Sequence, residues 1–298
     1  ESGLNAISKA FRRGLLRDGT MPTSDVEMAI RESQRCLKAS PVIVLGSGAS
    51  IPAGLPSMAD LATHLKQSTQ DGLFSGNDKT IWDTFIDKLR TQNLEQALQA
   101  VTLTDCLSDH VIKLTWDLVC TADACVLGKI LGNINYLPLT RLYRHLFNST
   151  NRTISVVTPN YDRLAEYAAD LGEYCSYTGF SYGYLRHRLS GSRPQSSQGF
   201  GQVRTIDIWK VHGCLDWFFH PQEQVIAITS ARAIPPGYHP AIVTPGVSKY
   251  ERTHLEPFRS IIAGADYALS QARAYLCIGF GFNDSHIQPK LLERWNRG

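Results

Sequence analysis

A run of small residues follows the first strongly apolar segment of the chain. Residues 42–57 read VIVLGSGASIPAGLPS. Glycine at the end of a strand lets the backbone come close to a ligand, and the following helix offers N–H groups and a partial positive charge to a pyrophosphate. The same glycine pattern is equally typical of an ordinary strand-to-helix turn. The small or turn-forming residues of this loop are Gly46, Gly48, Ala49, Ser50, Gly54, Pro56 and Ser57.

Two polar residues come directly after a second apolar run, in the segment TPNYD at residues 158–162. The side chain of Asn160 offers both a donor and an acceptor, which suits ribose hydroxyls or a positioned water. Asp162 could bind the same ligand or cap the next helix, and the sequence leaves both roles open.

Three later apolar runs also end in glycine. In KVHG, His212 precedes Gly213, and a histidine can take a proton from a ribose hydroxyl or a water near neutral pH. TPGVSKY occupies residues 244–250, and GFGFND contains Gly279, Gly281 and Asp284. Asp284 suits either ribose hydroxyls or the cap of a following helix. Because the carboxyl ends of parallel strands face one crevice, we expect all five segments to meet there.

Short apolar runs that alternate with helical patterns predict the elements that carry these residues. They favour an α/β, Rossmann-like fold with a mostly parallel sheet and helices on both faces. Residues 1–40 read as an N-terminal helical segment, and residues 41–298 as the main domain. Between about 60 and 150 the patterns are almost all helical, which predicts an inserted helical layer. The polar segment 181–202 reads as a mobile loop or a long hairpin tip.

Composition and charge exclude several classes of protein. Lys and Arg total 30 against 27 Asp and Glu, so the net charge of +3 does not indicate a nucleic-acid partner. The chain has neither an apolar stretch long enough to cross a bilayer nor a visible signal peptide, which favours a cytoplasmic location without membrane contact. The seven cysteines include no C-x-x-C pair, so we expect free thiols and no metal. Both chain ends read as cuts, so we expect a longer protein.

Taken in order, GSGAS, TPNYD, KVHG, TPG and GFGFND resemble the sirtuin-like family of NAD-consuming proteins. The resemblance is closest to the sirtuin-like domains of bacterial antiviral defence systems, which hydrolyse NAD. It implies that NAD lies across the C-terminal edge of the sheet as a substrate, with His212 and Asn160 as catalytic residues. The residues that it implies for NAD binding are Gly46, Gly48, Ala49, Ser50, Pro56, Asp162, Gly213, Gly279, Gly281 and Asp284.

This chain departs from the deacylase sirtuins in lacking two cysteine pairs for a zinc ribbon. The helical layer at 60–150 stands in place of that zinc module, so the resemblance favours water as the acceptor and an NAD⁺ hydrolase as the activity. A zinc-independent NAD-dependent protein deacylase and a non-catalytic nucleotide sensor are the alternatives. A Rossmann reductase is disfavoured, because Ile51 stands where its third glycine would fall. Constitutive NAD loss would be toxic, so we expect control by homo-oligomerisation or by a partner or domain beyond residue 298.

Overall fold

The structure, a computed structural model, describes residues 23–68, 72–189, 203–220, 224–229, 231–244, 255–284 and 286–296. Five parallel strands form the central sheet in the order β3–β5–β2–β1–β9. Their bounds are β1 (Val42–Leu45), β2 (Thr153–Thr158), β3 (Cys175–Tyr177), β5 (Thr205–Lys210) and β9 (Tyr275–Ile278). The expected parallel α/β fold is therefore confirmed. The three-residue strand β3 was not predicted.

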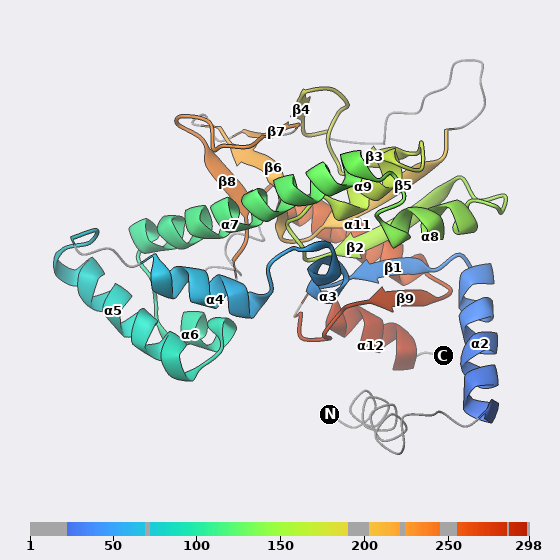
Figure 1. Cartoon of the computed structure of the whole chain (residues 1–298), viewed down its shortest axis with the longest axis horizontal. Coiled ribbons are helices and arrows are strands. Elements are labelled where there is room, and N and C mark those ends of the chain that lie inside the picture. Colours follow the sequence, from blue (N-terminus) through green and yellow to red (C-terminus); the bar gives the residue numbers. More distant parts are fainter. Residues whose placement is uncertain are drawn as a thin grey trace.

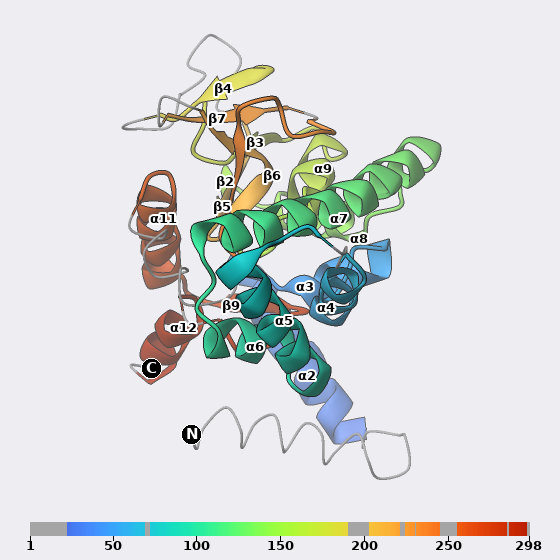
Figure 2. The same cartoon turned by 90° about the vertical axis from the view of Figure 1, so that its left-hand side faces the viewer.

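The side chains of strand β1 are buried on both faces of the sheet. Successive side chains of a strand point to opposite sides, so each face needs its own covering helices. Ile43 and Leu45 pack into one core together with side chains of three helices: α7 (Asp105–Gly132), α8 (Pro138–Leu146) and α9 (Leu164–Asp170). Val42 and Val44 pack into a second core with α11 (Phe258–Gln271) and α12 (Gln288–Asn296). Figure 2 shows α11 and α12 on one side of the sheet and α8 and α9 on the other.

The connection from β1 to β2 is helical through most of residues 60–150; we call this region the insertion, and its relation to a zinc module stays a prediction. The connection begins with α3 (Ser47–Ser50) and a short 3₁₀ helix (Ile51–Ala53), and continues through α4 (Met58–Gln67), α5 (Gly76–Thr91) and α6 (Leu94–Ala100). Helices α4, α5 and α6 and the first part of α7 bury a separate core that includes Leu65, Phe85 and Val111. Figure 1 shows α4, α5 and α6 extending to one side of the sheet. Helix α8, although it lies within residues 60–150, packs on the main sheet instead.

A capping box fixes the start of α4 and so the end of the glycine loop. The backbone N–H of Asp60 donates to Ser57 Oγ, and the backbone N–H of Ser57 donates to the Asp60 carboxylate at 2.8 Å. Each bond satisfies an N–H group at the helix start that would otherwise lack a partner. The loop that leaves β1 therefore has a defined length before the insertion begins.

A second, antiparallel sheet has the strand order β4–β7–β6–β8. Its strands are β4 (Leu185–His187), β6 (Gly213–Phe219), β7 (Val225–Ile228) and β8 (His239–Ile242). A separate antiparallel sheet was not predicted, because the apolar runs were expected to form one mostly parallel sheet. The prediction of a loop or long hairpin tip at 181–202 did not include β4, which pairs with β7. An antiparallel bridge joins Phe180 and Arg188, and residues 190–202 lie outside the described residues. Trp116 of α7 donates to the Leu215 carbonyl at 2.8 Å and so joins the insertion to this sheet.

The N-terminal helical segment is described only in part. Helix α2 (Thr23–Lys38) occupies the second half of the predicted segment 1–40, and residues 1–22 lie outside the described residues. In the part of the chain that the structure describes, no helix is both long enough and apolar enough to cross a membrane.

Candidate functional site

Four parallel strands end at one edge of the central sheet and bring the predicted site segments together. The segments after β1, β2, β5 and β9 contain Gly46, Asn160, His212 and Gly281 respectively. These four residues line one cavity of about 270 Å³. The edge is the one at which ligands bind in open parallel sheets.

The glycines after β1 are required by close packing against the segment after β9. A Cβ atom on Gly46 would lie 2.3 Å from the Gly279 carbonyl oxygen, and one on Gly279 would lie 2.0 Å from the Ala49 nitrogen. The Gly46 N–H donates to the Ile278 carbonyl and the Gly48 N–H donates to the Gly279 carbonyl, both at 3.0 Å. The Ala49 N–H donates to the Gly46 carbonyl at 3.0 Å. Three N–H groups of the predicted pyrophosphate loop are therefore bonded within the protein, and their contact with a phosphate stays a prediction.

Asn160 lies at the centre of a hydrogen-bond network that joins the segment after β2 to the segment after β1. Its amide NH₂ group donates to the Gly46 carbonyl at 2.9 Å and to Ser50 Oγ at 3.0 Å. Ser50 Oγ donates in turn to the Asp162 carboxylate at 2.8 Å, whose other oxygen accepts the Leu164 N–H. No hydrogen bond from a described residue reaches the side-chain carbonyl oxygen of Asn160. This oxygen can therefore accept a hydrogen bond from a ligand hydroxyl or from water.

His212 is buried and pairs with Asp284. Its Nε2 lies 2.6 Å from Asp284 Oδ2, and the other carboxylate oxygen accepts the backbone N–H groups of His286 and Ile287. His212 Nδ1 has no hydrogen-bond partner among the described residues. Since a neutral imidazole carries one N–H, donation from Nε2 to Asp284 leaves Nδ1 as the basic nitrogen. Asp284 therefore both orients His212 and caps the turn before α12.

A second cavity of about 490 Å³ lies next to the first, and Ser50, Asn160 and Asp162 line both cavities. Its other walls are mostly apolar: Leu45, Pro52, Tyr136, Leu137, Leu139, Leu142 and Ile278. Together the two volumes fall within the range of about 300–1,000 Å³ that is typical of small-molecule sites. Asn160 thus stands at the boundary between a mixed polar cavity and an apolar one.

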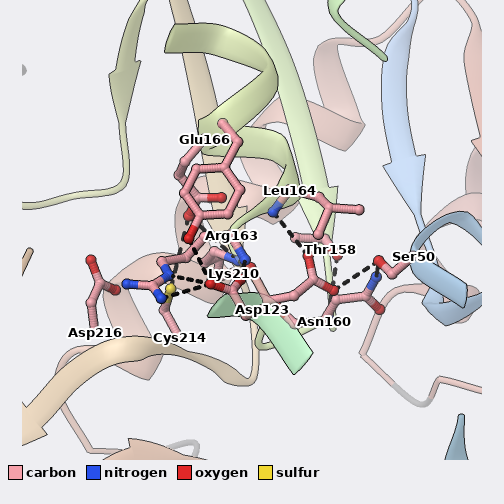
Figure 3. Close-up of polar contacts among 12 residues, drawn as sticks. Ser50, Asp123, Thr158, Asn160, Arg163, Leu164, Glu166, Lys210, Cys214 and Asp216 are labelled. Atoms are coloured by element: carbon pink, nitrogen blue, oxygen red, sulfur yellow. Dashed lines mark hydrogen bonds and ion pairs between the residues drawn. The ribbon is translucent and has the colours of Figure 1, made fainter. Parts of the chain in front are cut away.

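A buried cluster of charged groups adjoins the second cavity (Figure 3). Lys210 Nζ lies 3.4 Å from the Glu166 carboxylate, and Arg163 Nη2 lies 2.6 Å from Asp123. Burial raises the pKa of the Cys214 thiol to about 12, so this thiol is protonated at neutral pH. Burial also raises the pKa of Glu166, while the nearby Lys210 ammonium opposes that change.

The structure distributes the predicted binding residues between the two cavities. The first cavity is lined by Gly46, Ser50, Pro56, Asn160, Asp162, His212, Gly281 and Asp284. Gly48 and Ala49 line only the second cavity, and Gly213 and Gly279 line neither. Gly213 has a φ of +92°, and a Cβ atom there would lie 2.1 Å from the Ala241 carbonyl oxygen. Close packing against β8 therefore explains this glycine. The predicted segment 244–250 lies outside the described residues apart from Thr244.

Sequence reasoning missed the contribution of the insertion to the first cavity. The lining of this cavity includes Met58 and Leu61 of α4, Glu95 of α6 and Val119 of α7. It also missed Lys210, which appears in the sequence only as one charged residue at the end of an apolar run. Within the described ranges, no group of three or more His, Cys, Asp or Glu residues could hold a metal ion, and all seven cysteines are free.

The parallel sheet with helices on both faces, and the cavity at its C-terminal edge, define a Rossmann-type α/β domain. Residues 154–294 match the family model of the SIR2-like domain, a stretch from β2 to α12 that contains Asn160, His212 and Asp284. A solved structure of a mutant Sir2 homologue in complex with ADP-ribose is 15% identical, with a TM-score of 0.43, over 87% of this chain and 80% of that chain. No curated protein matches this chain.

Proposed function

We propose that this chain binds NAD at the C-terminal edge of the central sheet and hydrolyses it to nicotinamide and ADP-ribose. The observation that carries the proposal is the convergence of Asn160 and the paired His212 and Asp284 on one cavity beside the β1 loop. The match of residues 154–294 to the SIR2-like domain supports the same class of ligand.

The two neighbouring cavities suggest how the dinucleotide would bind. Neither the cavity of about 270 Å³ nor that of about 490 Å³ is large, but they share Asn160, so an extended ligand would pass this residue. An aromatic ring suits the apolar second cavity. A ribose suits the position beside Asn160 and Asp162, where an amide oxygen and a carboxylate can accept its hydroxyl protons. We expect the bond between ribose and nicotinamide to lie at this boundary.

Hydrolysis breaks the bond from the ribose anomeric carbon to the pyridinium nitrogen, and the bonding electrons neutralise the departing nicotinamide. A water oxygen bonds to the anomeric carbon, and the proton that this water loses passes to the imidazole of His212. The transition state is positively charged at the sugar. Glu95, Asp162 and Asp284 line the first cavity, whose described lining includes no Lys or Arg. The Lys210 ammonium lines the second cavity but is paired with Glu166, so the electrostatic environment favours the positive charge at the sugar. Proton transfer of this kind typically contributes about 100- to 10,000-fold.

The test is to incubate purified variants with NAD and to measure free nicotinamide. We expect His212→Ala and Asn160→Ala each to abolish NAD loss while the melting temperature stays near that of the wild type. The exposed histidine of β4 gives a matched control, because His187→Ala removes the same side chain away from the cavity. Undiminished turnover in both site variants would overturn the assignment.

The two other activities that the sequence leaves open give different results in the same assay. A zinc-independent deacylase would release nicotinamide only when an acetylated peptide is present. A nucleotide sensor would bind NAD in calorimetry and release no nicotinamide in any assembly state. Nicotinamide release from NAD and water alone supports hydrolysis over both.

We further propose that the helices of the insertion take the place of a zinc module, and that the protein depletes cytoplasmic NAD during antiviral defence. Residues of α4, α6 and α7 line the first cavity, so these helices would limit the space for a peptide acceptor beside the ligand. Self-association or a regulatory partner would then restrain the activity. NAD measured in infected cells that express the wild type or His212→Ala tests this role, and equal NAD levels in the two would contradict it.

A further inference from the structure

Lys210 is a buried cation that contacts the segment carrying Asn160 and Asp162. It is the last residue of β5, and only 1% of its side chain is exposed. Its Nζ donates to the Asn160 carbonyl at 3.3 Å and also to the Asp162 carbonyl. The third neighbour of the ammonium is the Glu166 carboxylate of α9 at 3.4 Å. An ammonium has three N–H donors, so these three acceptors satisfy it.

The need for this cation follows from the position of the segment in the fold. Residues 160–162 lie beyond the end of β2, where the ladder to β5 has finished, so their carbonyl groups have no partner in that ladder. Buried carbonyl groups without partners are costly. Lys210 bonds two of the three carbonyls, and the N–H of Leu215 bonds the third, that of Tyr161, at 3.0 Å.

The surrounding charges keep Lys210 protonated. Burial acts to lower the pKa of this ammonium, but its neighbours Cys214, Glu166 and Asp162 together outweigh burial and raise the pKa above the ordinary value. At neutral pH the Cys214 thiol is uncharged, so the two carboxylates supply the opposing charge. A neutral side chain of the same length could not bond all three acceptors. The positive charge of Lys210 therefore helps to hold the backbone of residues 160–162 in place.

We propose that Lys210 is a positioning residue, which holds Asn160 in register with the β1 loop and so sets the rate of the proposed reaction more than the affinity for the nucleotide. The inference rests on the proposed function. Figure 3 shows Lys210 among the polar contacts drawn around Asn160, Asp123, Arg163 and Glu166. A shift of the Asn160 backbone would displace the amide that bonds Gly46 and Ser50. Misplacement of a positioning group by about 1 Å typically costs about 100-fold in rate.

The variant that tests this role replaces the buried pair as a unit. Lys210→Met alone leaves the Glu166 carboxylate buried without its cation, and such a change alone can prevent folding. Lys210→Met/Glu166→Leu removes both charges and keeps similar volumes, an exchange that proteins often tolerate. Arg186→Met/Asp216→Leu is the matched control, because it removes another ion pair of the same cluster that makes no bond to residues 160–162.

We expect the Lys210→Met/Glu166→Leu variant to fold, to lose about 100-fold in kcat and to keep its KM nearly unchanged. The control pair variant should keep the wild-type kcat. The side-chain amide NMR signals of Asn160, identified by their loss in Asn160→Ala, should move in the first variant and not in the control. A merely structural contribution would lower the melting temperature of both variants and leave those signals unmoved.

Wild-type kcat in the folded Lys210→Met/Glu166→Leu variant would overturn the inference, and so would a lower kcat with unmoved Asn160 signals. Failure of the proposed function is distinguishable from either result. A wild-type protein that neither binds nor cleaves NAD defeats the proposed function, and the Asn160 signals then still decide whether Lys210 positions that residue.

Discussion

Nε2 of His212 lies 2.6 Å from Oδ2 of Asp284, although the two residues are 72 positions apart in the chain. Asp284 also accepts two backbone N–H groups through its other oxygen. The carboxylate is thus held by the turn before α12 and in turn fixes the histidine ring. This arrangement selects the tautomer that leaves Nδ1 basic.

Asp284→Asn tests the importance of that tautomer. The asparagine oxygen can still accept the N–H groups of His286 and Ile287, but its NH₂ group would donate to His212 Nε2 and move the ring proton to Nδ1. We expect nicotinamide release from NAD to fall about 100-fold or more, with little change in melting temperature. Turnover close to that of the wild type would show that the pairing has no part in the reaction.

Gly279→Ala should destabilise the fold, whereas Gly281→Ala should not. Gly279 has a φ of +60°, and its Cβ atom would lie 2.0 Å from the Ala49 nitrogen. We expect the free energy of unfolding of the Gly279→Ala variant to be lower than that of the wild type by more than about 2 kcal/mol, as measured by denaturant titration. At Gly281 the nearest contact of a Cβ atom is the flexible side chain of Asn283 at 3.5 Å, so this variant is the matched control. Equal stability of the two variants would contradict the packing argument.

Arg163→Met should be far more costly than the same substitution at an exposed arginine. Asp123 is fully buried, and Arg163 supplies the charge that balances it, with a contact of 2.6 Å. Removal of one partner of a buried ion pair typically costs about 3–5 kcal/mol. The exposed pair of Arg90 and Asp87 gives the control, and Arg90→Met should change the free energy of unfolding by less than about 1 kcal/mol. Similar losses in the two variants would rule out a special role for burial.

The lowered pKa of His110 predicts that the folded protein loses stability at acidic pH. Burial and the charge of Lys113 lower the pKa of this histidine, whose ring packs against Phe74 and Trp82. The folded state therefore binds fewer protons than the unfolded state around and below pH 6.5. The stabilisation is present above that pH and is lost as the pH falls through the lower, folded-state pKa. We expect the melting temperature to fall less on acidification in His110→Phe than in the wild type, and identical falls would contradict this.

Helices and strands with a continuous or periodic apolar run could be predicted from the sequence. Those that pack against several different cores could not, because their apolar residues follow no single pattern. The run VIVL before Gly46 predicted β1, because a strand buried on both faces is apolar throughout. Helix α7 was not recognised as one element. Its apolar residues face the insertion core at Val111, the antiparallel sheet at Trp116 and the main core at Val126, so no single apolar stripe marks it. The short strands β3 and β4 have only three residues each, too few for a periodic signal.

The sequence by itself determined which segments end in polar or glycine-rich turns, because buried strands and their exits have recognisable composition. That was enough to name Asn160 and His212. Only the tertiary structure decided which partners those residues have, because contacts between distant segments depend on packing. It paired His212 with Asp284, packed the glycines after β1 against Gly279, and brought the Lys210 ammonium to the carbonyl groups of Asn160 and Asp162.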